Sequence, residues 1–306
     1  MKKRAVKDVA ASVRQKLLNN AKSTNRPFQE VLQYFAMERF LYRLAQSPYA
    51  DKFVLKGALM FTVWGAPATR PTKDIDFLAR TKNTVAAVLP IIRAVCTQQV
   101  EPDGLVFDDT TVEGALIKED ADYEGIRVTF LATLQNARVS MQLDLGYGDV
   151  VVPSPKMADY PVILDLPVPR IRAYSRETVV AEKFEAMVKL GQLNSRMKDF
   201  FDLWLLSRQF DFDGVTLATA IGKTFENRKT PIPTEALALT SAFADDLTKQ
   251  TQWKGFLRKA RLEKAPEDLH DVIDALRVFL QPVAGAARDA IDFTRTWNAP
   301  GPWRAS

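Results

Sequence analysis

The stretch TKDIDFLAR, residues 72–80, places two carboxylates one residue apart among bulky apolar side chains. Side chains alternate across a strand, so Asp74 and Asp76 share one face while Ile75 and Phe77 share the other. Two like charges this close repel each other, and a cation held between them would remove the repulsion. The pattern therefore predicts a strand whose acidic face binds a cation.

A third carboxylate lies on a second predicted strand, RVSMQLDLGYG. Its odd-numbered apolar residues share one face, while Ser140, Gln142 and Asp144 share the other. Asp144 is thus expected to face a cleft, from a strand able to pair beside the one that carries Asp74 and Asp76. Three converging carboxylates are the ligand set of a two-metal phosphoryl-transfer site, with Mg²⁺ as the expected ion and Mn²⁺ as the alternative.

A strand, a turn and a helix precede the acidic strand. FVLKG is interpreted as a short strand and ALMFTVWG as a helix that begins after Gly57. The free backbone N–H groups at the start of this helix would bind a phosphate. In the loop APATRPTK, Arg70 and Lys73 either contact a triphosphate or are ordinary surface charges. Thr72 is expected to make a local hydroxyl–backbone bond, and is also a position where phosphorylation would block the site.

The segment LKGALMFTVWG…TRPTKDIDF resembles the glycine motif and the D-x-D motif of DNA polymerase β-type nucleotidyltransferases. More narrowly, the chain is similar to the AbiEii/AbiGii family, the toxin halves of bacterial toxin–antitoxin and abortive-infection systems. The likeness runs through MERFLYRLAQSPYADKFVLKGA, LDLGYGD, ETVVAEKFEAMVKLG and SRMKDFFDLWLL. Where the family usually has Gly or Ser, this chain has Ala58, which leaves a backbone N–H but no hydroxyl for the phosphate.

Two predicted helices carry a lysine and two acids. Lys183, in AEKFEAMV, lies on an apolar stripe, and Asp199 and Asp202, in RMKDFFDLW, lie three residues apart on a helix that is largely apolar. Buried acids need partners, so Lys183 is expected to pair with one of them, as a purely structural ion pair in the simplest interpretation. The resemblance implies instead that Lys183 and Asp199 are active-site residues, with Asp202 structural.

Composition excludes several other classes of protein. The 306 residues are 47% hydrophobic and 26% charged, as in ordinary globular proteins. With one cysteine (Cys96) and one histidine (His270, expected on a helix surface), a disulfide framework, a zinc site and a Ser-His or Cys-His catalytic system are disfavoured. No apolar run approaches the ~20 residues that span a bilayer, and the N-terminus lacks a signal-peptide core, so a cytoplasmic protein is expected.

Positive charge is concentrated in residues 1–50. Ten Lys or Arg against three acids give this segment +7, whereas the whole chain carries +5, so the remainder sums to −2. A basic segment predicts a polyanion partner, most simply nucleic acid, or else a solvated helix surface. The candidate RNA contacts are Lys2, Lys3, Arg4, Lys7, Arg14 and Lys16.

The expected fold class is α+β, with a small mixed sheet of the polymerase β type and a C-terminal helical domain. Three parts are predicted: 1–50, two basic helices; 51–165, the nucleotidyltransferase core; and 166–306, mainly helical and capped at its first helix by Ser175.

Within these parts, residues 101–124 are predicted to be an acidic loop, and the two strands that follow are expected to meet at a tight turn at QNA. The proline-rich stretch 153–171 is interpreted as a connector. Pro90 predicts a helix break or start, and the final NAPGPWRAS a frayed end.

The resemblance implies a nucleotidyltransferase toxin with a cognate antitoxin, transferring NMP from NTP to RNA, most simply the tRNA 3′ end. A monomer is expected, although the sequence does not fix the oligomeric state. Asp74 and Asp76 are expected to hold the metals, Asp144 to help activate the acceptor hydroxyl, Lys183 to steady phosphate charge and Asp199 to orient Lys183 or the nucleotide. The nucleotide contacts are expected to be Gly57, Ala58, Arg70, Thr72 and Lys73. Two alternatives remain: transfer to a protein hydroxyl or a small molecule such as an aminoglycoside, and a non-catalytic module that binds RNA or a partner.

Overall fold

The computed structural model describes residues 8–66, 70–120, 123–262 and 265–305. The chain divides into two compact units. The first comprises Met1–Gly65, Thr72–Gly148 and Lys156–Ala173, and the second comprises Ala66–Pro71, Asp149–Pro155 and Tyr174–Ser306. This division differs from the three predicted parts, because α2 (Phe28–Gln46) packs on the sheet of the first unit and α1 (Val9–Ser23) packs on α2, so the N-terminal helices do not form a separate part.

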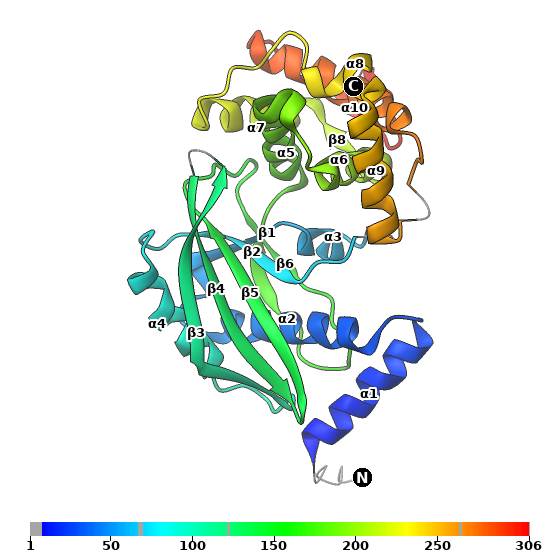
Figure 1. Cartoon of the computed structure of the whole chain (residues 1–306). Coiled ribbons are helices and arrows are strands. Elements are labelled where there is room, and N and C mark those ends of the chain that lie inside the picture. The colour runs from blue at the N-terminus through cyan, green and yellow to red at the C-terminus, as the bar shows by residue number, and fades with distance from the viewer. Residues whose placement is uncertain (1–7, 67–69, 121–122, 263–264, 306) are drawn as a thin grey trace. The chain divides into compact units, whose positions relative to one another are not determined.

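The first unit begins with helices and ends with a run of strands, and helices and strands alternate only over residues 53–120 (Figure 1). Its elements are α1 (Val9–Ser23), α2 (Phe28–Gln46), η1 (Ala50–Lys52), β1 (Phe53–Lys56), α3 (Leu59–Val63), β2 (Asp74–Ala79), α4 (Val85–Cys96), β3 (Leu105–Asp120), β4 (Tyr123–Leu134), β5 (Ala137–Gly146), β6 (Lys156–Asp159) and β7 (Arg170–Ala173).

A seven-stranded mixed sheet organises this unit, with the strand order β3-β4-β5-β2-β1-β7-β6. β2 runs parallel to β5, and β1 runs parallel to β7, whereas the other neighbours are antiparallel. The acidic strand β2 therefore lies inside the sheet, between β1 and β5. The predicted pair of strands joined at QNA is confirmed as β4 and β5, paired from Leu134 and Ala137 onward.

The helices α2 and α4 lie on one side of this sheet (Figure 1). Phe40 of α2 packs against Phe107 of β3 and Phe130 of β4, with ring centroids 5.8 and 5.3 Å away. α1 begins after Asp8, whose carboxylate accepts the Ala11 N–H at 2.9 Å as an N-cap. The apolar face of α2 thus covers one side of the sheet, and the acids of β2 lie on the opposite side.

Two sequence predictions in this unit are wrong. Most of residues 101–124 form the strand β3 and its partner's start, because the buried side chains of Phe107 and Val112 anchor an edge strand. Pro90 neither breaks nor starts α4, which runs from Val85 to Cys96. Pro90 lies on the exposed side and forfeits one backbone bond, while the buried Val88 and Ile92 hold the helix in place.

The proline-rich stretch 153–171 also departs from its interpretation as a connector. Its two ends form β6 and β7, which pair with each other, and Leu55 of β1 pairs with Ala173 of β7. Between β6 and β7, the Ile163 N–H donates to the buried Glu38 carboxylate at 2.7 Å, and Arg39 donates to the Pro167 carbonyl at 2.7 Å. From Lys156 onward this stretch is thus tied to α2 and belongs to the first unit, whereas residues 153–155 belong to the second.

The second unit is mainly helical, as predicted. Its elements are α5 (Arg176–Leu190), η2 (Gly191–Leu193), α6 (Met197–Gln209), β8 (Phe212–Asp213), α7 (Gly214–Asn227), η3 (Leu237–Leu239), α8 (Ser241–Asp245), α9 (Leu247–Ala260), α10 (Leu269–Arg288), β9 (Arg295–Trp297) and β10 (Trp303–Ala305). Ser175 is the N-cap of α5 and accepts the Thr178 N–H at 3.1 Å, which confirms the predicted cap.

The C-terminal end is not frayed over its described residues. β9 and β10 form a hairpin that pairs with β8, and Trp297 and Trp303 are both buried. The Trp297 indole N–H donates to the Ser207 carbonyl at 2.7 Å, and the Trp303 indole N–H donates to the Phe279 carbonyl at 2.8 Å. Two large aromatic side chains with satisfied donors anchor a segment whose Pro and Gly content resembles a loose tail.

Among the described residues, no helix is both long enough and apolar enough to span a membrane.

Candidate active site

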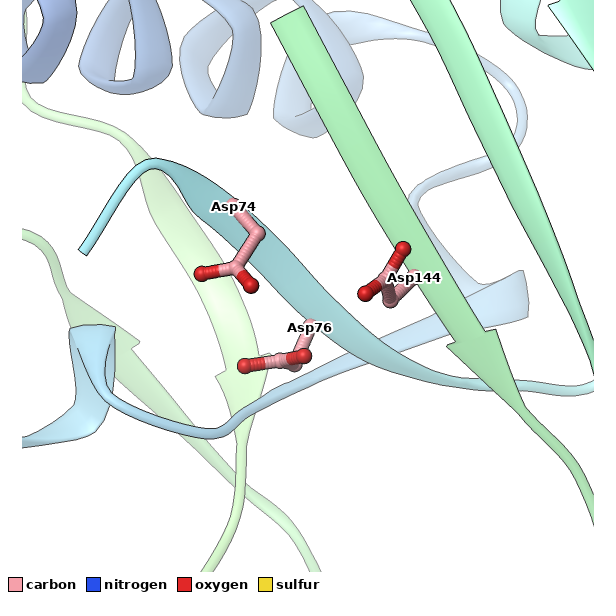
Figure 2. Close-up of side chains that lie close together, drawn as sticks. All are labelled: Asp74, Asp76 and Asp144. Atoms are coloured by element: carbon pink, nitrogen blue, oxygen red, sulfur yellow. The ribbon is translucent and has the colours of Figure 1, made fainter. Parts of the chain in front are cut away.

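Three carboxylates meet on the first unit's sheet (Figure 2). Asp74 and Asp76 lie on β2, and Asp144 lies on the neighbouring strand β5, where it is the direct register partner of Asp76. One oxygen from each of the three side chains lies within 4.8 Å of the others. The predicted convergence of the three acids is therefore present in the structure.

The donor set of this cluster suits a hard divalent cation. All three members are aspartates, so every available ligand is a carboxylate oxygen, the type of ligand that Mg²⁺ and Mn²⁺ prefer over nitrogen or sulfur. Asp74 and Asp76 are half-buried and Asp144 is buried, which limits the water that screens their mutual repulsion.

Two neighbours fix the orientation of the β2 acids. The Thr72 hydroxyl donates to Asp74 Oδ1, and the Thr72 N–H donates to the Tyr34 hydroxyl at 3.1 Å. The expected hydroxyl–backbone bond of Thr72 is therefore replaced by a bond to the Asp74 side chain. Asp76 packs against Gly57, which has a φ of +71° and precedes the short helix α3.

Asp144 is engaged by two side chains of its own sheet. Arg127 of β4 donates through Nε to Oδ1 and through Nη2 to Oδ2, both at 2.8 Å. Gln142 Nε2 lies 3.3 and 3.2 Å from the same two oxygens. The hydrogen bond to Asp144 is the main cause that raises the pKa of Arg127 above its usual value, and the charges of Asp74 and Asp76 add to it.

A second cluster of charges lies in the second unit. Lys183 Nζ of α5 lies 2.5 Å from Asp199 Oδ1 and 2.9 Å from Asp202 Oδ2, both on α6. Asp199 also faces Arg196 Nε at 2.7 Å, and Arg70 donates to both oxygens of Asp202 at 3.1 Å. Lys183 thus pairs with both acids, where the sequence predicted one, and Asp202 is a full member of this cluster.

Burial and ion pairing oppose each other in this cluster. Burial favours neutral forms, but Asp199 and Asp202 together outweigh it and raise the pKa of Lys183. Burial likewise opposes ionisation of Asp199, yet Lys183 and Arg196 lower its pKa to about 2. The burial of Asp202 is likewise outweighed by Arg70 and Lys183, which lower its pKa, so Lys183 and both aspartates are ionised at neutral pH.

The remaining candidates are placed as follows. Arg70 belongs to the second unit and pairs with Asp202, whereas Lys73, which directly precedes β2, is exposed. Ala58 is the N-cap position of α3 and makes no side-chain cap bond. His270 lies in the first turn of α10, half-buried between Asp245 and Asp268, in agreement with a helix-surface role.

Of the six candidate RNA contacts, two can be described. Arg14 and Lys16 are exposed on α1, and the Arg14 guanidinium lies 5.6 Å from the Phe28 ring centroid. Lys2, Lys3, Arg4 and Lys7 lie outside the described residues.

Two residues near the acids were missed from the sequence. Arg127 is the direct register partner of Asp144, and Lys56 of β1 is the direct register partner of Asp76 and is buried. Directly opposed residues on neighbouring strands share a face of the sheet. Arg127 had a usable signal, because it and Asp144 lie equally far from the turn that joins β4 to β5.

Comparisons with known proteins identify the family of this chain. The sequence model of a family described as the nucleotidyl transferase AbiEii toxin, type IV toxin–antitoxin system, matches residues 39–278. Among solved structures, JHP933 from Helicobacter pylori is similar, with 15% identity, a TM-score of 0.44, and coverage of 86% of this chain and 93% of that one. A second H. pylori protein, named as a candidate nucleotidyltransferase, has the same identity and TM-score, with coverage of 86% and 96%. No curated protein matches the chain significantly.

The family match covers well over half of the chain and includes both β2 and the α5–α6 pair. This chain is therefore a nucleotidyltransferase that belongs to the AbiEii toxin family of type IV toxin–antitoxin systems.

Proposed function

We propose that this enzyme transfers NMP from an NTP to an RNA acceptor, the 3′ end of tRNA, with Mg²⁺ held by Asp74, Asp76 and Asp144. The observation that carries the proposal is the convergence of these three carboxylates within 4.8 Å on adjacent strands. Family membership implies a nucleotide substrate and an antitoxin partner. The metal, the acceptor and the role of each residue are our proposals.

The reaction forms a bond between an acceptor hydroxyl oxygen and the α-phosphorus, and breaks the bond from that phosphorus to pyrophosphate. When bound, the divalent ions would neutralise triphosphate charge and lower the pKa of the acceptor hydroxyl. Asp144 is the proposed proton acceptor, since it lies beside both β2 acids. Thr72 holds the Asp74 carboxylate in one orientation, and the missing side chain at Gly57 leaves room for Asp76.

Lys183 is the proposed phosphate-charge residue of the second unit, with Asp199 as its positioning residue. Its raised pKa keeps the ammonium charged at neutral pH, which suits a group that stabilises developing negative charge on phosphate. The side chain keeps 15% of its surface exposed, whereas Asp199 keeps only 1%. A lysine anchored by buried acids yet still open to solvent is suited to contact a ligand.

An RNA acceptor is favoured over a small molecule by the basic N-terminal segment. RNA is long, and its backbone needs contacts beyond the reacting end. Arg14 and Lys16, both exposed on α1, are the described residues available for such contacts.

The acceptor is tested by incubating the purified protein with α-phosphate-labelled NTPs and, separately, total RNA, total protein and an aminoglycoside mixture. We expect label in RNA of tRNA size, sensitive to ribonuclease and absent with Asp74→Asn. Label confined to protein or to the aminoglycosides would reject the RNA acceptor while keeping the transferase. Absence of label from every acceptor, with folded protein and Mg²⁺ present, would favour a binding module.

A further inference from the structure

Arg127 binds Asp144, which is one of the three carboxylates proposed to hold the metal. Arg127 makes a two-pronged contact with Asp144, using Nε on one oxygen and Nη2 on the other, both at 2.8 Å. The Gln142 amide lies within 3.3 Å of the same oxygens. Asp144 is the most buried member of the carboxylate cluster.

Such a contact occupies the part of the carboxylate that a cation would use. A carboxylate offers about four lone-pair positions, and a planar guanidinium fork takes two of them in parallel. With Gln142 added, little acceptor capacity remains on Asp144. A divalent ion that also contacts Asp74 and Asp76 must therefore share Asp144 with Arg127 or displace it.

Arg127 can move away from Asp144 more easily than Asp144 can move away from Arg127. Its side chain is 43% exposed, whereas that of Asp144 is only 9% exposed, so the arginine has an open path to solvent and the aspartate does not. Arg127 also lies on β4 directly opposite Asp144, which is in turn directly opposite Asp76 of β2. It thus serves as a counter-charge to the whole cluster, attached through one member.

We propose that Arg127 is a resident counter-cation of the carboxylate cluster, which competes with the divalent ion for Asp144 and releases it when the ion binds. This inference rests on the proposed metal site. Before the ion binds, the charge of Arg127 offsets the repulsion among the three carboxylates. The ion can then contact all three only after Arg127 has moved away from Asp144. Once released, the guanidinium lies at the same face of the sheet, where an acceptor phosphate is its natural new partner.

The test is a titration of metal-stripped protein with Mn²⁺, following unbound Mn²⁺ by electron paramagnetic resonance. Competition predicts that Arg127→Met binds Mn²⁺ more tightly than the wild type, on the order of tenfold, the equivalent of one charge-assisted hydrogen bond. Arg127→Lys keeps the charge but removes the fork, so it should also bind more tightly, by a smaller factor.

Three controls separate competition from simpler effects. Arg138→Met removes an equal charge from the same strand as Asp144 and should leave Mn²⁺ affinity within about twofold. In an Asp144→Asn background, Arg127→Met should tighten Mn²⁺ binding much less than it does in the wild type, because the contested carboxylate is gone and only the effect of the arginine's charge remains. A thermal scan in EDTA should show Arg127→Met melting below the wild type, with the gap narrowing in saturating Mn²⁺.

Equal or weaker Mn²⁺ binding by Arg127→Met would overturn the inference and make Arg127 a residue that holds Asp144 for the metal. Tighter binding in Arg127→Met with wild-type binding in Arg127→Lys would reduce the effect to net charge, and would also overturn it. Asp74→Asn reports on the proposed site itself: if it binds Mn²⁺ as the wild type does, the metal site is wrong. If Asp74→Asn abolishes binding while Arg127→Met changes nothing, only the competition is wrong.

Discussion

Asp76 occupies the space that a side chain at residue 57 would need. A Cβ built on Gly57 would lie 1.8 Å from Asp76 Oδ2 and 2.6 Å from Asp76 Cγ. Gly57 also has a φ of +71°, a conformation that L-residues rarely adopt. A glycine is therefore needed in the turn after β1, because any side chain at residue 57 would move the Asp76 carboxylate.

Gly57→Ala should abolish transfer, because the new Cβ forces Asp76 out of the carboxylate cluster. Gly65→Ala is the matched control, since Gly65 has a φ of +70° and nothing within 4 Å of its Cβ position. Both variants should be destabilised by roughly 1–2 kcal/mol through backbone strain, measured by urea unfolding. Only Gly57→Ala should be deficient in activity and Mn²⁺ binding, and an active Gly57→Ala would show that the position of Asp76 is not critical.

Lys183 can be tested apart from its ion pair with Asp199. Replacing Lys183 alone with Met leaves two buried acids short of a partner and should cost ~3–5 kcal/mol of unfolding free energy. Lys183→Met combined with Asp199→Asn removes one charge of each sign and should recover much of that stability. If Lys183 stabilises phosphate charge, turnover stays at least ~100-fold down in the double variant. Recovery of turnover along with stability would make the pair purely structural.

Lowering the pH should reduce the unfolding free energy of the second unit, because Asp199 becomes protonated. Its pKa in the folded protein is about 2, against a usual 3.8, so the unfolded chain takes up the proton at the higher pH. The contribution is complete above about pH 4 and disappears as pH falls towards 2, amounting to roughly 2 kcal/mol. Between pH 5 and 2.5, the unfolding free energy of Asp199→Asn should therefore fall less steeply than that of the wild type.

The control for this pH effect is a carboxylate with an exposed partner. The hydrogen bond from Arg288 also lowers the pKa of Asp289, but solvent screens this surface pair, so Asp289→Asn should change the pH slope much less than Asp199→Asn does. Parallel curves for wild type and Asp199→Asn would contradict the lowered pKa.

RNA binding should depend on salt through the basic N-terminal segment. Log K should fall with log[salt], and each phosphate that the protein no longer neutralises should reduce the slope by about 0.7 for single strands or 0.9 for duplex. Arg14→Gln with Lys16→Gln should flatten the slope, measured by filter binding, without changing NTP affinity.

A variant of equal charge change provides the comparison. Lys223→Gln with Arg277→Gln removes two cations, exposed Lys223 and half-buried Arg277, that already face acids in the second unit, Glu226 and Asp274. This pair should keep the full salt slope. If both double variants flatten it equally, net charge is responsible and the N-terminal segment has no special role.

The alternation of side chains along each strand was enough to predict the acidic face. Contacts that depend on which strands are neighbours were harder to predict from the sequence. Asp74, Asp76 and Asp144 follow from side-chain alternation on two strands, and their meeting needed only that β2 and β5 be neighbours. Arg127 was within reach, since it and Asp144 both lie seven residues from the pair Leu134–Ala137 at the turn. It was missed because an arginine on a strand face resembles ordinary solvated charge.

The errors share a physical cause, namely tertiary packing that overrides local preference. The acidic composition of β3 resembles a loop, but an edge strand needs only one buried face, here supplied by Phe107 and Val112. The C-terminal hairpin contains turn-forming residues, and its order comes from Trp297 and Trp303, whose indoles donate to carbonyls distant in sequence. Neither contact leaves a local signal.

The most direct test of the central claim is transfer of label from α-phosphate-labelled NTP to RNA by metal-stripped protein, before and after Mg²⁺ is added. The wild type should be inactive in EDTA, become active on addition of Mg²⁺ and release pyrophosphate. Asp76→Asn, folded and matched in concentration, should stay inactive under both conditions, and its expression should be harmless where the wild type is toxic. Label transfer in EDTA, or by Asp76→Asn, would contradict a metal-dependent reaction at the three carboxylates.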